Sequence, residues 1–251
     1  MTERTAVTLD RANIKNLAKE SMKGKKPRVY WVAVFYLVVV NILSELSYRM
    51  QLGNLDLNRV VAEISQGHSI NMPQLSFVGA VLLLAVTVMS GVLSMGFQGF
   101  CLRIGRKQHA GIGEIFDIFS IFFKAFALLF MMGIFIFLWS LLFVIPGIIA
   151  AYRYSFAPYI LLDCPDKGVL QCIRESKELT KGYKWQLFVL DLSFIGWELL
   201  ASVPSVLAGA SPIIALVGSI LISAFVTPYR TIATSMYYNR LSDWTGVITQ
   251  E

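Results

Sequence analysis

The sequence has 251 residues, of which 56% are hydrophobic and only 15% are charged. Soluble globular domains carry about 25% charged residues, so this composition excludes an ordinary soluble fold. The formal net charge is +6, but the Lys and Arg residues lie between long apolar blocks and form no separate basic domain, so we expect no nucleic-acid partner.

The first 28 residues are predicted to be a basic cytoplasmic segment that contains an amphipathic helix. Within 9–23, apolar residues fall close to one helical face and basic residues occupy the remainder. Such a helix can lie on a membrane surface and contact anionic lipid through its cations. The alternative is a solvated, partly disordered tail. The expected lipid-contacting residues are Lys15, Lys19, Lys23, Lys25, Lys26 and Arg28.

Apolar blocks fill most of 29–241, and a bilayer is crossed by about 20 helical residues. The block at 125–162 is too long for one span, and Pro146-Gly147 near its middle predicts a turn. The loops at 102–124 and 163–185 are predicted to carry amphipathic interfacial helices. We therefore predict an all-α, multi-pass bundle with a cytoplasmic tail at 242–251. Its six spans lie at about 29–46, 76–101, 125–145, 148–162, 186–203 and 212–238.

The distribution of basic residues predicts the orientation of this bundle. With six spans, Arg49 and Arg59 lie outside and Arg153 lies within a span, whereas the other Lys and Arg residues lie on a single side. Because positive loops stay in the cytoplasm, both termini are expected there. A five-span arrangement would place the basic loop 163–185 outside, which the same rule disfavours.

Four charged residues fall inside the predicted spans: Arg153, Asp191, Glu198 and Arg230. A charge at the bilayer centre costs about 2.5–3.5 kcal/mol on insertion scales, so these side chains should pair with one another or meet water. Counting residues from the span ends predicts that Glu198 pairs with Arg153 and that Asp191 approaches Arg230.

Two prolines accompany this predicted charged network. Pro158 removes the amide that would bond the carbonyl of Tyr154, and Pro228 does the same for Ala224. Kinked helices around buried charge are typical of transporters. Structural ion pairs that lock a helical bundle are the alternative interpretation.

Three stretches carry a family resemblance: IPGIIAAYRYSFAPYILLD (145–163), IRESKELTKGYKWQLFVLDLSFIGWELL (173–200) and PYRTIATSMYYNRL (228–241). They resemble a bacterial integral membrane family catalogued as domain of unknown function nine-seven-five. The resemblance implies a multi-pass protein of the bacterial cytoplasmic membrane, and the family's activity is not established. Arg174, Ser176 and Leu179, with Gly182 and Trp185 following, are more distantly similar to the membrane domain of some glycerophosphodiester phosphodiesterases.

The sequence predicts no catalytic, cofactor or metal site. His68 and His109 lie in opposite loops of the predicted topology, and the three cysteines have no zinc-like spacing. The first hypothesis is a non-enzymatic scaffold or binding protein that acts at the cytoplasmic face. Its expected partners are anionic lipid and either a protein partner or a second copy of itself. The alternative is a transporter or carrier that uses a polar pocket around Asp191 and Glu198.

Overall fold

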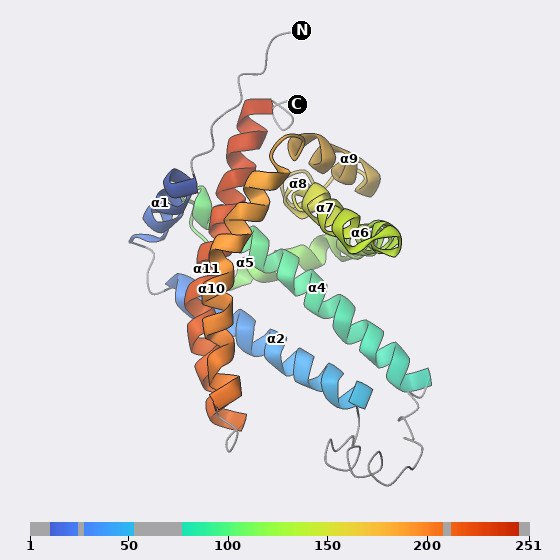
Figure 1. Ribbon diagram of the computed structural model, residues 1–251, viewed down its shortest axis with the longest axis vertical. Helices are drawn as coiled ribbons and strands as arrows, with labels where there is room; N and C mark the ends of the chain where they lie inside the picture. The colour runs from blue at the N-terminus through green and yellow to red at the C-terminus, as the bar shows by residue number, and fades with distance from the viewer. Residues whose placement is uncertain (1–10, 25–27, 53–76, 208–211, 246–251) are drawn as a thin grey trace.

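The computed structural model describes residues 11–24, 28–52, 77–207 and 212–245, and all regular structure in these ranges is helical. Figure 1 shows α10 and α11 running side by side, with α2 and α4 crossing them obliquely and α6–α9 on the other side of α4. The helices are α1 (Arg11–Met22), α2 (Arg28–Leu52), α4 (Phe77–Gly105), α5 (Gly113–Phe116), a 3-10 turn η1 (Asp117–Ile121), α6 (Phe122–Leu142), α7 (Val144–Tyr154), α8 (Ala157–Asp163), α9 (Val169–Leu179), α10 (Lys184–Leu207) and α11 (Pro212–Thr245).

Five helical segments are long and apolar enough to cross a membrane. They are Arg28–Ser47, Phe77–Gly105, Gly113–Leu142, Lys184–Pro204 and Leu216–Asp243. Together they confirm an all-helical protein with helices suited to a membrane. The predicted fourth span at 148–162 is not one continuous helix, because α7 and α8 divide it.

The predicted hairpin in 125–162 forms from α6 and α7, which pack along each other. The predicted position of its turn is wrong. The chain reverses at Phe143, which is extended with φ −163° and ψ 155°, and Pro146 lies in the first turn of α7. Proline is tolerated there because first-turn amides have no partner inside the helix. Gly147 then lets α7 approach α6 closely, since a Cβ at this position would lie 2.1 Å from the Ser140 hydroxyl.

The break between α7 and α8 falls where Pro158 predicts one, and α9 stabilises it. Pro158 lies in the first turn of α8. The buried hydroxyl of Ser176 on α9 accepts the Phe156 N–H at 3.1 Å and donates to the Arg153 carbonyl at 3.0 Å. Thr180 donates to the same carbonyl at 3.3 Å. These hydroxyls supply partners that the helix ends lack. By contrast, α11 continues as a helix through Pro228.

Helix α4 is the central helix and contacts α1, α2, α5, α6, α8 and α11. Its glycines face different neighbours at close range. A Cβ on Gly96 would lie 2.0 Å from the Ile115 carbonyl oxygen, and one on Gly105 would lie 3.0 Å from the Ser235 hydroxyl. Small residues allow membrane helices to pack this closely.

The buried core occupies one end of the bundle. Buried positions cover the start of α2, the end of α4, the start of α10 and the end of α11. The opposite halves of these helices expose large apolar side chains, such as Phe77, Leu84, Trp197, Leu200 and Leu221. Apolar side chains in a bilayer contact lipid without penalty, so these halves need little protein packing.

Candidate functional site

The charged residues of α10 and α11 form one cluster around Arg230. Its Nε lies 3.1 Å from Asp191 Oδ1, and its Nη1 forms an ion pair with Glu198 Oε1. Asp191 and Glu198 are two helical turns apart and therefore share a face of α10. The predicted pairing of Asp191 with Arg230 is confirmed, and this Arg bridges both acids.

The predicted pairing of Arg153 with Glu198 is wrong, because Glu198 pairs with Arg230. Arg153 is the last but one residue of α7, and its Nε is buried without a hydrogen-bond partner. The neighbouring residue Tyr152 faces α10, where its ring meets Phe188 edge-on at 5.9 Å. Successive helical residues are about 100° apart, so Arg153 leaves α7 in another direction. The predicted pair was based on equal depth of the two residues in the membrane, which does not specify the direction in which each side chain leaves its helix.

A second cluster, which the sequence did not predict, joins three helix ends. Arg106 follows α4, and its Nη1 and Nη2 bind the two carboxylate oxygens of Asp163 at 2.6 and 2.7 Å. The same guanidinium donates to Asn239 Oδ1 at 3.1 and 2.9 Å. Tyr238 of α11 donates to Asp163 Oδ2 at 2.9 Å. Bidentate, charge-assisted bonds of this kind are among the stronger polar interactions in proteins.

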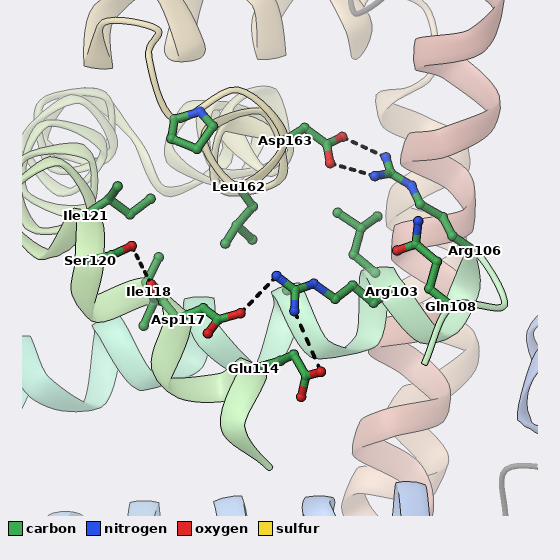
Figure 2. A pocket seen from close by; sticks show the side chains of 13 residues that line it. Arg103, Arg106, Gln108, Glu114, Asp117, Ile118, Ser120, Ile121, Leu162 and Asp163 are labelled. Atoms are coloured by element: carbon green, nitrogen blue, oxygen red, sulfur yellow. Dashed lines mark hydrogen bonds and ion pairs between the residues drawn. The ribbon is translucent and has the colours of Figure 1, made fainter. Parts of the chain in front are cut away.

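A polar cavity of about 220 Å³ lies beside this pair. Figure 2 shows it between Leu162, Asp163, Asp117 and Arg103. Arg103 Nη2 pairs with Asp117 at 2.9 Å, and Nη1 lies 3.8 Å from Glu114. Glu114 also accepts the Gly111 N–H at 2.5 Å, which holds the turn before α5 in place. The cavity therefore contains five ionisable side chains of both signs.

The Arg106–Asp163 pair also borders a second polar cavity of about 410 Å³, which Asn239 and Asp243 complete. Neither of these two cavities includes Asp191 or Glu198 in its lining. The polar space described around the ends of α4, α8 and α11 is thus separate from the Arg230 cluster.

Helix α1 is present as predicted, but its apolar face contacts protein. Ile14, Ala18 and Met22 are buried, and α1 packs on α11 and α4. The Lys15 ammonium lies 4.6 Å from the centre of the Phe194 ring. Burial, followed by repulsion from Arg11, lowers the pKa of Lys15. The apolar face is therefore not available to enter lipid, and Lys15 belongs to the packing.

The other predicted lipid-contacting cations differ in position. Lys19, Lys23 and Arg28 are exposed. Lys25 and Lys26 lie outside the described residues. A cationic surface beside α1 thus remains accessible even though the helix is docked on the bundle.

Within the described ranges, no group of three or more His, Cys, Asp or Glu residues is placed to hold a metal ion. Cys101 and Cys172 are buried and Cys164 is half-buried, and these three residues form no disulfide in the described part of the chain. Burial, reinforced by the nearby Glu175, raises the pKa of Cys172 to about 11. At neutral pH this thiol is protonated and a poor nucleophile.

One sequence signal could have indicated the Arg106 cluster. In the predicted topology, Arg106, Asp163 and Asn239 all lie at helix ends on the cytoplasmic side. An acid that directly ends an apolar block, as Asp163 does, is placed to pair with a cation at another helix end. The sequence does not indicate which cation that is.

No curated protein and no solved structure matches the chain. The distant similarity to glycerophosphodiester phosphodiesterases is therefore not supported. One family model, described as a protein of unknown function (DUF975), matches residues 141–244. This range holds α7–α10, most of α11 and all four residues of the predicted intramembrane network. The match supports the predicted family resemblance over residues 141–244.

Proposed function

We propose that this protein is a non-enzymatic membrane protein that binds partners at its cytoplasmic face. The observation that carries the proposal is the polar cavity where α4, α5, η1 and α8 meet. It lies at the end of the bundle that contains the buried core, so its walls are held by packed helices. Binding sites built on rigid elements keep their geometry better than sites on loops.

The proposed topology has six spans, with both termini in the cytoplasm. In this arrangement α7 and α8 cross the bilayer together as a broken fourth span, from Val144 to Asp163. Those 20 positions would reach about 30 Å as one straight helix, and the break shortens that reach. The basic loops support this orientation in the bacterial cytoplasmic membrane. The exposed Lys19, Lys23 and Arg28 would then face the anionic inner leaflet.

A carrier is the second candidate, and the Arg230 cluster favours it. The side chains of Arg230 and Glu198 are 39% and 46% exposed although they lie in segments apolar enough to span a membrane. Partly exposed charge at that depth marks ion or substrate pathways in transporters. Against a carrier, Arg230 pairs with both acids, and neither polar cavity described above includes them in its lining.

Photo-crosslinking in intact cells tests the proposal. A benzophenone amino acid is placed at Gln108, beside the cavity, and at Leu141, near the far end of α6, as the matched control. We expect position 108 to yield a discrete protein adduct or a selected lipid, and position 141 to yield lipids in bulk bilayer proportion. The same bulk lipids at both positions would contradict binding at this face.

Flux assays in sealed vesicles address the carrier. Solute or ion flux that Asp191→Asn abolishes, in a protein that still folds, would replace the binding proposal with transport. Absence of coupled flux, together with selective crosslinking at position 108, would leave binding as the function.

A further inference from the structure

The lining of the 220 Å³ cavity defines the chemistry of its ligand. At roughly 30 Å³ per water molecule, the cavity holds about seven waters, which suits a compact polar group rather than a drug-sized molecule. Its charged residues are Arg103, Arg106, Glu114, Asp117 and Asp163. Two cations and three carboxylates give the lining a net charge of −1, which disfavours a purely anionic ligand.

Arg103 is the cation with hydrogen-bonding capacity to spare. Arg106 directs Nε and both Nη atoms at Asp163 and Asn239. Arg103, by contrast, has one short contact, to Asp117, while Glu114 at 3.8 Å is beyond hydrogen-bond distance. Its side chain is 42% exposed, so a ligand can reach it. A planar guanidinium with free N–H groups matches phosphate oxygens.

The carboxylates of the lining favour a ligand that carries a cationic group next to the group bound by Arg103. Asp117 is the most exposed of the acids and lies directly against Arg103, and Glu114 is on the same side of the cavity. Quaternary ammonium groups are recognised by aromatic rings, and none of the residues that line this cavity is aromatic. Carboxylate oxygens instead accept the three N–H donors of a primary ammonium.

The surroundings of the cavity favour a ligand that is the headgroup of a lipid. Phe116, Phe119 and Phe123 project from α5, η1 and the start of α6, and Phe123 is 84% exposed. Asp117, Ser120 and Ile121 of the same segment line the cavity. This segment therefore presents aromatic rings to its surroundings and polar groups to the cavity. A headgroup could enter the cavity while its acyl chains remain beside the phenylalanines.

We propose that this cavity binds a phosphate ester that carries a primary ammonium group, as in the headgroup of phosphatidylethanolamine. Arg103 binds the phosphate, and Asp117 with Glu114 binds the ammonium. This assignment rests on the proposed function, which requires only that some partner binds at this face.

Native mass spectrometry of the full-length protein tests the headgroup. The protein is purified into detergent micelles that contain equal amounts of phosphatidylethanolamine, phosphatidylcholine and phosphatidylglycerol. We expect preferential retention of phosphatidylethanolamine and a roughly tenfold weaker retention for Arg103→Ala, as expected for one lost charge-assisted bond. Lys177→Ala removes an exposed cation on α9, outside the cavity lining, and should change nothing.

Each other outcome overturns a stated part of the assignment. Equal retention of phosphatidylcholine contradicts the ammonium site, and preference for phosphatidylglycerol contradicts the charge argument. Unchanged retention in Arg103→Ala contradicts the location. If that variant fails to fold, Asp117→Asn at the exposed acid provides the same test.

A soluble competitor distinguishes the two sources of this chemistry. Glycerophosphoethanolamine should displace the lipid only in excess if acyl chains contribute to binding. Tight binding of the soluble compound without lipid retention would assign the cavity to a free phosphate ester and overturn the lipid source. Selective crosslinking at position 108 without preference for ethanolamine would overturn this inference alone and leave the proposed function standing.

Discussion

Replacement of Ser176 by alanine tests whether α9 stabilises the break between α7 and α8. The Ser176 side chain is buried, and its hydroxyl serves both the Phe156 N–H and the Arg153 carbonyl. Alanine leaves the buried Phe156 N–H without this acceptor. Thr180 still reaches the carbonyl at 3.3 Å. One unsatisfied buried donor and one weakened acceptor together cost about 2–3 kcal/mol.

The expected result is a local loss of stability, visible as opening of α9. Cys172 is buried on the same helix, and its raised pKa keeps it unreactive while α9 is docked. A cost of about 2–3 kcal/mol increases the opened population between about 30-fold and 150-fold. Maleimide labelling of Cys172, followed by peptide mapping, should accelerate by a similar factor, and thermal stability in detergent should fall.

Ser155→Ala is the matched control for this prediction. Its hydroxyl lies at the same break but donates only to the Tyr152 carbonyl, three residues earlier at 2.9 Å. If Ser176→Ala labels no faster and melts no lower than Ser155→Ala, the buried hydroxyl does not stabilise the break. Adding Thr180→Val removes the remaining hydroxyl donor, so the double variant should lose more than the sum of the two single losses.

Further predictions concern packing, charge, topology and pH. Gly96→Ala should cost at least about 1–3 kcal/mol in thermal unfolding, because the added Cβ overlaps a carbonyl of α5. Gly133→Ala, with open space, should be tolerated, and equal losses would contradict the close approach. Arg230→Gln should lower detergent stability more than neutralising either acid alone, since it leaves two unpaired carboxylates; a smaller loss would refute a shared cation. A cysteine at Val144 should react with impermeant reagents from outside the cell, and labelling only from the cytoplasm would refute the six-span topology. Labelling of Cys172 should keep rising with pH beyond about 8.5, the ordinary pKa of a thiol, toward its own pKa of about 11, and a plateau already reached near pH 9 would indicate an unperturbed thiol.

Hydropathy was sufficient to predict the long apolar helices, because about 20 predominantly apolar residues are needed to cross a bilayer as a helix. It could not locate the turn in 125–162, where every residue near the turn is compatible with a helix. Proline followed by glycine is typical of a turn, but Pro146 is accommodated in the first turn of α7. The chain reverses instead at Phe143, where nothing in the residue type indicates an extended backbone.

In the charged network, the depth of a residue in the membrane predicts one ion pair correctly and another wrongly. Counting along the helices paired Asp191 with Arg230 correctly, because α10 and α11 are neighbours in sequence and run side by side. Counting residues from the span ends gave the wrong partner for Arg153. A pair between Arg153 and Glu198 requires that α7 pack against the second half of α10 and that Arg153 face α10. Depth is one coordinate of a side chain, and the direction around the helix is another that only packing supplies.

The Arg106 cluster could not be predicted from the sequence, because its residues are far apart in the chain and only helix packing brings them together. Arg106 is 57 residues from Asp163 and 133 from Asn239, and the three belong to three different helix ends. Topology limits which residues can meet, because alternate helix ends lie on the same side of a membrane. Which of them do meet depends on the order of helices around α4, and its glycines decide which neighbours approach closely.

The position of the core follows from the same physics and supports the proposed position of the binding site. Lipid can solvate apolar side chains, so the outer halves of α4, α10 and α11 need few protein neighbours. Polar groups at helix ends and breaks, such as the Arg153 carbonyl and the Asp163 carboxylate, must find partners in the protein or in water. These groups are concentrated near the ends of α4, α7, α8 and α11, and the helices converge there to satisfy them. A polar layer results at the end of the bundle that contains the buried core. For this reason we place ligand recognition in that layer, and not between the apolar outer halves of the helices.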